Sequence, residues 1–291
     1  KEMRAIFGLL PTLQRRWLTS ATQAIDLPDF IPQDQLQRLD HSRPAHAPAD
    51  GLRVCALLTH SSHRQADFLR LVQYVGHATT LIFCNQKAPV ERVSQWLDEQ
   101  GLEHGTFHGD LEQAERELAL LRFRNQTYRI LLATDLAARG LDIPHLENII
   151  HYQLPHAEAA FIHRNGRTAR MQAEGTAYVL LEEDQPWRPY LDDRLEYIEL
   201  PNALPPIQPS PWQTLYISAG KKDKVNKFDL VGALLKKGGL KPEELGLVVV
   251  QDKRAYAAVK RSKVQQVIKH ENHSSVYIGA VYAGGCHCPC H

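Results

Sequence analysis

The chain has 291 residues, which is enough for two domains that each bury a hydrophobic core. Its apolar fraction of 43% and charged fraction of 23% are ordinary for a globular protein, and no apolar run approaches the ~20 residues of a membrane span. The net charge of +1 conceals an asymmetry: residues 212–291 hold 13 basic and 6 acidic residues, whereas residues 1–211 hold 21 and 27. A basic C-terminal module on an acidic body indicates a polyanionic partner.

The first 50 residues carry little globular pattern. Residues 1–25 are predicted to be a helix and a strand without a sheet of their own, and residues 26–50 contain four prolines and are predicted to be a linker. Arg15 and Arg16 follow without a small-residue cleavage site, so no signal peptide is expected. Cys55 and Cys84 each stand alone in a strand-like run, which indicates a reducing compartment and a cytoplasmic protein.

Residues 51–185 alternate between strand-like and helix-like segments. Such alternation predicts a parallel α/β sheet with flanking helices, and near-continuous apolar strands indicate that both faces of the sheet are covered. The expected strands are 52–58, 79–84, 106–108, 128–133, 148–152 and 175–181, and the expected helices are 63–75, 89–100, 111–124 and 158 onward.

Two polar segments in this domain predict a site. Arg164, Arg167 and Arg170 recur at i, i+3 and i+6, a spacing that on a helix points three guanidinium groups into one space suited to phosphate. Thr134 and Asp135 follow the apolar run 130–133, at the carboxyl end of a strand, where open α/β sheets bind ligands. The plainer alternatives are a solvated helix face and a helix cap.

A proline-rich linker is predicted at 186–211, followed by a small α+β domain at 212–283. Its expected order is β-α-β-β-α-β, which is the ferredoxin-like order of RNA-recognition modules. Tyr216 and Tyr256 are candidate base-stacking residues, with ordinary strand-surface tyrosines as the alternative. The expected elements are strands 213–218, 246–251, 255–260 and 275–282 and helices 227–237 and 264–270.

Lysines gather in the segment after the first strand of this domain. Lys221, Lys222 and Lys224 are the expected phosphate contacts, although a charge run can also be a solvated turn. The tail 284–291 carries Cys286, Cys288 and Cys290 interleaved with histidines, but their spacing is tighter than in structural zinc sites. We therefore predict no metal site there.

The order and spacing of these motifs resemble those of the DEAD-box RNA helicases. The resemblance includes the segments 81–87, 108–116, 133–142 and 163–170, together with Phe123-Arg124 and Ser20-Ala21-Thr22. Asn165 and Ala169 stand where that family more often has Ile and Gly. The segment from residue 212 resembles the C-terminal RNA-binding domain of the DbpA-type members.

The resemblance implies a RecA-like α/β domain followed by an RRM-like domain, and it implies roles for particular residues. Arg167 and Arg170 would be arginine fingers on ATP, Asp142 would meet its ribose, and His163 and Arg164 would link the ATP and RNA sites. The core residues on the RNA backbone would be Gly109, Gln113, Arg116, Thr134 and Asp135, and the residues for coupling between helicase domains would be Ser20 and Thr22.

Two parts of such a helicase are missing from this sequence. It contains no phosphate-binding loop ending in Gly-Lys-Ser/Thr and no Asp-Glu-Ala-Asp box for Mg²⁺. We therefore expect a piece of an ATP-dependent RNA helicase that cannot hydrolyse ATP alone, because ATP and Mg²⁺ would be held mainly by a missing first domain. The expected partner is structured ribosomal RNA in large-subunit assembly, and the expected state is a monomer away from membranes. The alternative is a non-catalytic RNA-binding protein with RecA-like and RRM-like domains, and a DNA helicase is a weaker third reading.

Overall fold

The computed structural model describes residues 51–138, 146–168, 174–191, 195–271 and 277–281, with a few single residues elsewhere. Nearly all of these residues belong to one compact unit, residues 50–291. The predicted Ser20 and Thr22 motif and the Cys-His tail lie outside the described residues, and the linker at 26–50 lies almost entirely outside them. In the described part of the chain, no helix is long and apolar enough to cross a membrane.

The first sheet of the larger unit has seven parallel strands in the order β3-β4-β2-β5-β6-β1-β7. The central strands β2, β4 and β5 are buried along their whole length, as their apolar sequences predict. The strands are β1 (Leu52–Thr59), β2 (Thr80–Cys84), β3 (His104–Phe107), β4 (Ile130–Thr134), β5 (Asn148–His151), β6 (Gly175–Glu182) and β7 (Glu196–Tyr197).

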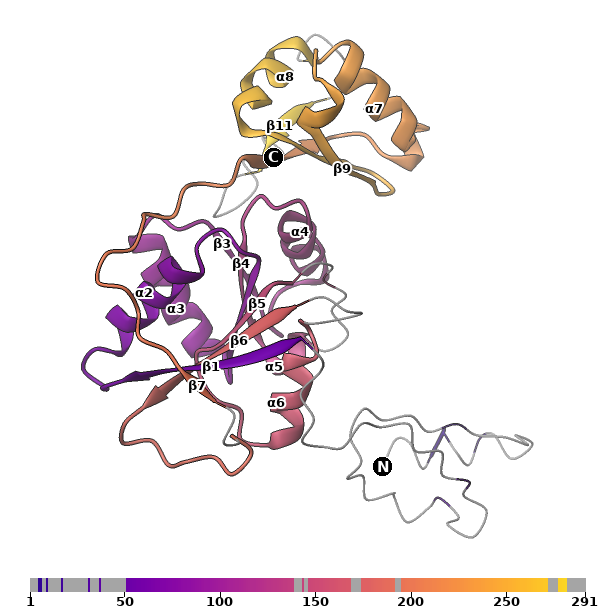
Figure 1. Ribbon diagram of the computed structural model, residues 1–291. Helices are drawn as coiled ribbons and strands as arrows, with labels where there is room; N and C mark the ends of the chain where they lie inside the picture. The colour runs from indigo at the N-terminus through magenta and orange to yellow at the C-terminus, as the bar shows by residue number, and fades with distance from the viewer. Residues whose placement is uncertain are drawn as a thin grey trace. The chain divides into compact units, whose positions relative to one another are not determined.

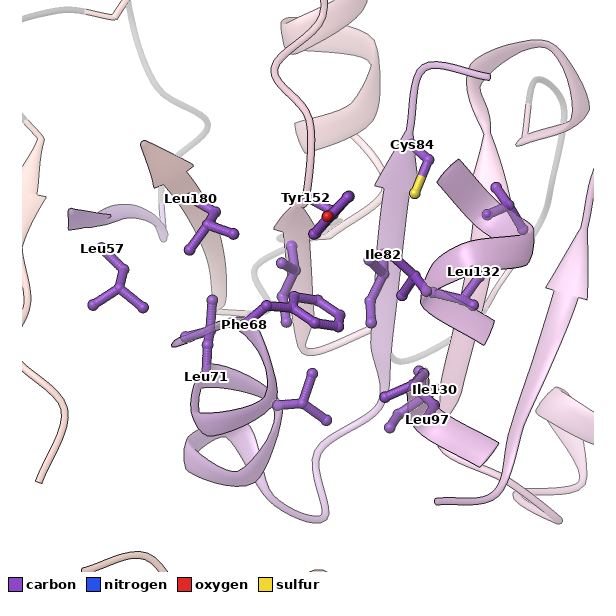
Figure 2. Close-up of a cluster of buried hydrophobic side chains, with 14 residues drawn as sticks. Leu57, Phe68, Leu71, Ile82, Cys84, Leu97, Ile130, Leu132, Tyr152 and Leu180 are labelled. Carbon is purple, nitrogen blue, oxygen red and sulfur yellow. The ribbon is translucent and has the colours of Figure 1, made fainter. Parts of the chain in front are cut away.

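Helices cover both faces of this sheet (Figure 1). On one face lie α2 (Arg64–Val75) and α3 (Lys87–Glu99), and on the other lie α4 (Gln113–Arg124), α5 (Asp135–Ala138) and α6 (Glu158–Asn165). Figure 2 shows how Phe68 and Leu71 of α2 and Leu97 of α3 meet the apolar side chains of the strands. The predicted parallel α/β domain is thus confirmed, with most element ends within two residues of expectation.

The segment predicted as the linker 186–211 folds partly onto this domain. Its residues 196 and 197 form β7, which pairs in parallel with β1 at the sheet edge. Ile198, Leu200 and Ile207 pack against the core beneath α2, and Arg70 donates to the carbonyl of Pro201 at 2.9 Å. Prolines are compatible with an edge strand, so proline content alone did not reveal that this segment is anchored.

The C-terminal domain is an antiparallel sheet in the order β11-β8-β10-β9, with two helices packed against one face. This confirms the predicted β-α-β-β-α-β order. Asn226 caps the first helix by accepting hydrogen bonds from the backbone of Phe228 and Asp229. The elements are β8 (Trp212–Ile217), α7 (Lys227–Lys236), β9 (Leu245–Val250), β10 (Ala255–Lys260), α8 (Val264–Glu271) and β11 (Ile278–Ala280), with short 3₁₀ turns η1 (Lys221–Asp223), η2 (Pro242–Glu244) and η3 (Arg261–Lys263).

Candidate nucleotide and nucleic-acid interface

The parallel sheet brings the carboxyl ends of β2, β4 and β5 to one edge. The side chain of Arg164, in the last turn of α6, contacts residues at all three ends. Its Nε and Nη2 form a two-pronged ion pair with Asp135 at 2.5 and 2.7 Å. The same guanidinium donates to Asn85 Oδ1 at 2.8 Å and to the carbonyl of Gln153 at 2.6 Å. It also lies over the Phe83 ring at 4.9 Å. Three segments, at the ends of β2, β4 and β5, therefore meet at this one side chain of α6.

Arg164 departs from its predicted place in a cluster of three phosphate-facing arginines. Its side chain is 2% exposed, which makes it one of the largest fully buried side chains among the described residues. The reason is that α6 ends at Asn165 and Gly166 caps it, so the helical i, i+3, i+6 spacing does not continue to Arg167. Arg170 and Asp142 lie outside the described residues.

The buried imidazole of His151 supports Arg164 from the other side. His151 Nε2 donates to Asn165 Oδ1 at 2.8 Å, which leaves Nδ1 as the acceptor facing Arg164 Nη1 at 3.4 Å. Burial, together with the nearby Arg164 charge, lowers the pKa of His151 to about 3. The ring is therefore neutral at physiological pH and serves as a hydrogen-bonding spacer.

We call Arg164 and its partners Asp135, Asn85 and Gln153 the Arg164 hub. His163 and Arg167 flank a small depression beside it. With Asp135, Ala160 and Arg164 they line a cavity of about 30 Å³, roughly the space of one water molecule. His163 is exposed and Arg167 is half-buried. This surface can offer two polar groups to a phosphate, but it cannot by itself enclose a nucleotide.

The predicted RNA-backbone residues of the core fall into two groups on the carboxyl edge. Gly109, Gln113 and Arg116 lie together where β3 leads into α4, and Arg116 Nη2 donates to the carbonyl of Gly109. Thr134 and Asp135 lie at the end of β4, but both carboxylate oxygens of Asp135 accept hydrogen bonds from Arg164. Thr134 is 8% exposed. The structure therefore offers Gln113 and Arg116 as the more accessible contacts.

The predicted lysine cluster lies on a loop that is seated against the β9–β10 turn. The backbone N–H groups of Lys221 and Lys222 donate to the carbonyls of Gln251 and Asp252 at 2.9 and 2.8 Å. Lys224 turns the chain in the left-handed region at φ 62°. All three lysine side chains are exposed, so they are available to phosphate.

The predicted stacking tyrosines lie on the sheet face that packs against α4. Tyr216 and Tyr256 form an edge-to-face pair at 5.9 Å. Tyr256 is 3% exposed and clusters with Leu121 and Val281, and Leu118 and Tyr216 pack at the margin of this cluster. In this arrangement the Tyr256 ring is covered by protein, so it cannot stack on a base.

Polar contacts reinforce this packing. Thr214, on β8, is fully buried and its hydroxyl receives a hydrogen bond from Asn125 Nδ2 at 3.1 Å and pairs with Thr127 Oγ1 at 2.5 Å. Arg261 Nη2 contacts both carboxylate oxygens of Glu103, at 2.6 and 2.9 Å. The C-terminal domain thus contacts α4 and the residues after it through apolar and neutral polar groups, and it contacts Glu103, before β3, through an ion pair.

The two described cysteines are free thiols inside the α/β domain. Cys55 and Cys84 are buried, and burial raises the pKa of the Cys84 thiol to about 12. Within the described ranges, no cluster of histidine, cysteine or carboxylate side chains could hold a metal ion.

Several residues of the hub and its surroundings were not predicted from sequence. Asn85, His151, Gln153 and Asn165 are ordinary polar residues near strand or helix ends, and their role depends on contacts with residues far along the chain. The only local signal was position, since Asn85 and Gln153 both follow a buried strand at the ligand-binding edge.

Two family models match consecutive parts of the chain. The helicase conserved C-terminal domain covers residues 64–172, and the DbpA RNA binding domain covers residues 214–277. The chain belongs with the DbpA-type DEAD-box helicases. The two matches fall within the α/β domain and the RRM-like domain described above.

Curated relatives agree with this assignment. The ATP-dependent RNA helicase DbpA of Escherichia coli is 34% identical over 69% of this chain and 45% of its own length. DbpA of Bacillus subtilis is 26% identical over 95% of this chain and 64% of its own length. The chain thus spans between about half and two thirds of these relatives. Among solved structures, E. coli SrmB bound to RraA is 29% identical over 45% of this chain and 78% of that chain, with a TM-score of 0.42.

Proposed function

We propose that this chain is the RNA-binding portion of an ATP-dependent RNA helicase, comprising the second helicase domain and a domain that tethers it to RNA. The observation that carries the proposal is the Arg164 hub, which fixes the segments after β2, β4 and β5 around one guanidinium. A rigid edge of this kind suits a surface that must contact RNA and nucleotide in a defined geometry. The DbpA-type RNA-binding domain supplies the second half of the argument.

The residues present fit one wall of an ATP site. Arg167 and His163 lie at the edge of a depression of about 30 Å³, where they can contact phosphate oxygens but not surround them. Bound ATP would supply the free energy of the cycle, and Mg²⁺ would be held by groups outside the described residues. We propose that Arg167 contributes from this side as an arginine finger. The same role for Arg170 and the ribose contact of Asp142 stay predictions, since both residues lie outside the described part of the chain.

The RNA would be gripped in two places. In the helicase domain, Gln113 and Arg116 at the start of α4 would contact the sugar-phosphate backbone, which carries little sequence information. In the C-terminal domain, Lys221, Lys222 and Lys224 would bind phosphates of a structured RNA. We propose ribosomal RNA as that target, within large-subunit assembly, and a monomeric cytoplasmic protein.

Binding of the full chain to a labelled ribosomal RNA hairpin, in a series of salt concentrations, tests the proposal. We expect hairpin-selective binding that weakens with salt. In a Lys222→Ala variant, the slope of the logarithm of the binding constant against the logarithm of the salt concentration, which we call the salt slope, should be smaller by about 1. Equal, weak binding to every RNA of the same length would contradict a specific tether.

The enzymatic part of the proposal needs a second measurement. The chain alone should show no ATP hydrolysis above the rate in buffer, because its residues would contact only one side of the nucleotide. Mixed with the separately produced first helicase domain of a DbpA relative, it should show RNA-stimulated hydrolysis that Arg167→Ala reduces by roughly 10³-fold or more. If the mixture hydrolyses ATP at the same rate with Arg167→Ala, the alternative of a non-catalytic RNA-binding protein is favoured.

A further inference from the structure

A basic cleft of about 760 Å³ opens where the C-terminal domain meets α4. Lys221, Lys222, Lys253 and Arg254 supply its positive charge. Gly220 makes the cleft possible, since a Cβ there would lie 2.4 Å from the carbonyl oxygen of Gln251 and 2.6 Å from the amide nitrogen of Arg254. The close approach of these two loops brings all four cations together, so the cleft is a built feature of the fold.

One acidic side chain enters this cleft from the helicase domain. Glu117 of α4 accepts a hydrogen bond from Gln113 Nε2 at 3.0 Å through one carboxylate oxygen. Its other oxygen faces Gln251 Nε2 at 3.4 Å. Gln251 in turn accepts from Arg254 Nε at 3.0 Å. The Glu117 carboxylate therefore lies between a core residue proposed to contact RNA and the cationic cleft of the tethering domain.

We infer that this cleft carries a single strand of RNA from the C-terminal domain to Gln113 and Arg116, and that Glu117 is a latch whose carboxylate competes with the RNA phosphate for the two amide donors. The inference rests on the proposed function and adds to it a path and a controlling residue. The competition follows from charge, because an anion beside four cations lowers their attraction for another anion. Removing the charge while keeping the side-chain shape should favour RNA.

The test compares two labelled RNAs on the full chain. One is a blunt ribosomal RNA hairpin, and the other is the same hairpin with a single-stranded extension of about ten nucleotides, within the usual length of single-strand sites. Glu117→Gln should tighten binding of the extended hairpin roughly three- to tenfold. It should tighten the blunt hairpin by a clearly smaller factor, because that RNA contacts Lys221 and Lys222 but does not extend to Gln113 and Arg116. Lys253→Ala should weaken the extended hairpin and lower its salt slope by about 1.

Glu243→Gln is the matched control, because it removes the same charge from an exposed site at the far end of β9, about 17 Å of strand away. It should change neither affinity by more than about twofold. An equal gain with Glu243→Gln, no gain with Glu117→Gln, or the same gain on both hairpins would overturn the inference. If the unaltered chain binds neither hairpin, the proposed function itself has failed.

Discussion

Arg164 shows how one residue can look like a ligand-binding group in the sequence and act as a structural one in the fold. Its guanidinium satisfies Asp135, Asn85 and the carbonyl of Gln153, all while 2% exposed. Lysine carries the same charge but cannot reproduce the planar, multi-pronged geometry. The buried partners would then lack their donors, and an unsatisfied buried group is costly.

We predict that Arg164→Lys destabilises the chain by about 1–3 kcal/mol, because acceptors around the buried side chain lose their hydrogen-bond donors while the charge is kept. Urea unfolding followed by circular dichroism measures this. Arg167→Lys, three residues further along the chain at a half-buried position, should stay within about 1 kcal/mol of the unaltered chain. Similar losses in both variants would show that Arg164 is not the organising residue.

His151 makes stability depend on pH. Its folded pKa of about 3 lies below the unfolded value of about 6.5, so between these pH values the unfolded chain binds a proton that the folded chain does not. The stability due to neutral His151 is fully present above pH 6.5 and is lost progressively as pH falls toward the folded pKa. Between pH 6.5 and 5 the loss should reach about 2 kcal/mol.

Urea unfolding at several pH values tests this dependence against His151→Gln, which keeps a polar side chain but cannot titrate. The variant should be less stable at neutral pH, because it disturbs the contacts with Asn165 and Arg164. Its stability should fall less steeply on acidification. Parallel pH profiles for the two chains would contradict the assignment.

At the scale of the elements, sequence periodicity predicted well what depends on near neighbours. The buried strands and the helices on both sheet faces follow from continuous apolar runs and helical spacing. The Arg164 hub could not be predicted from periodicity, because the Arg164–Asn85 contact joins residues 79 positions apart. Tyr256 was predicted as a surface residue for the same reason, since nothing in β10 shows that α4 covers it.

The end of α4 offers a prediction at this scale. Gln126 follows the helix with φ at 57°, in the left-handed region that costs a residue with a side chain about 1–2 kcal/mol. Its side chain is exposed. Gln126→Gly should relieve this strain at the cost of some unfolded-state entropy, for a net stabilisation of about 0.5–1 kcal/mol.

Thermal and urea unfolding measure that gain, and Gln95→Gly within α3 is the comparison. That variant should lose about 1 kcal/mol, as glycine does in the interior of a helix. If Gln126→Gly also destabilises the chain, the strain at the end of α4 is smaller than the entropy that glycine adds.

At the scale of the larger unit, α4 serves both domains. Its first turn carries Gln113 and Arg116 toward the proposed RNA path, while Leu118 and Leu121 pack against the sheet of the C-terminal domain. The buried Thr214 hydroxyl meets the residues that follow α4. Because one helix carries both sets of contacts, the tethering domain should be mechanically coupled to the helicase domain rather than loosely attached.

Thr214→Val tests this coupling with little change of shape. Valine removes the partner of Asn125 and Thr127 in a fully buried place, which should cost about 1–3 kcal/mol. Hydrogen exchange should then accelerate in peptides from both α4 and β8, since both surfaces are exposed when the domains separate. Thr106→Val, within β3 of the helicase sheet, should not accelerate exchange in β8. Acceleration confined to β8 in the Thr214 variant would mean that the contact stabilises only the C-terminal domain, and a path for RNA along α4 would then lack a fixed second wall.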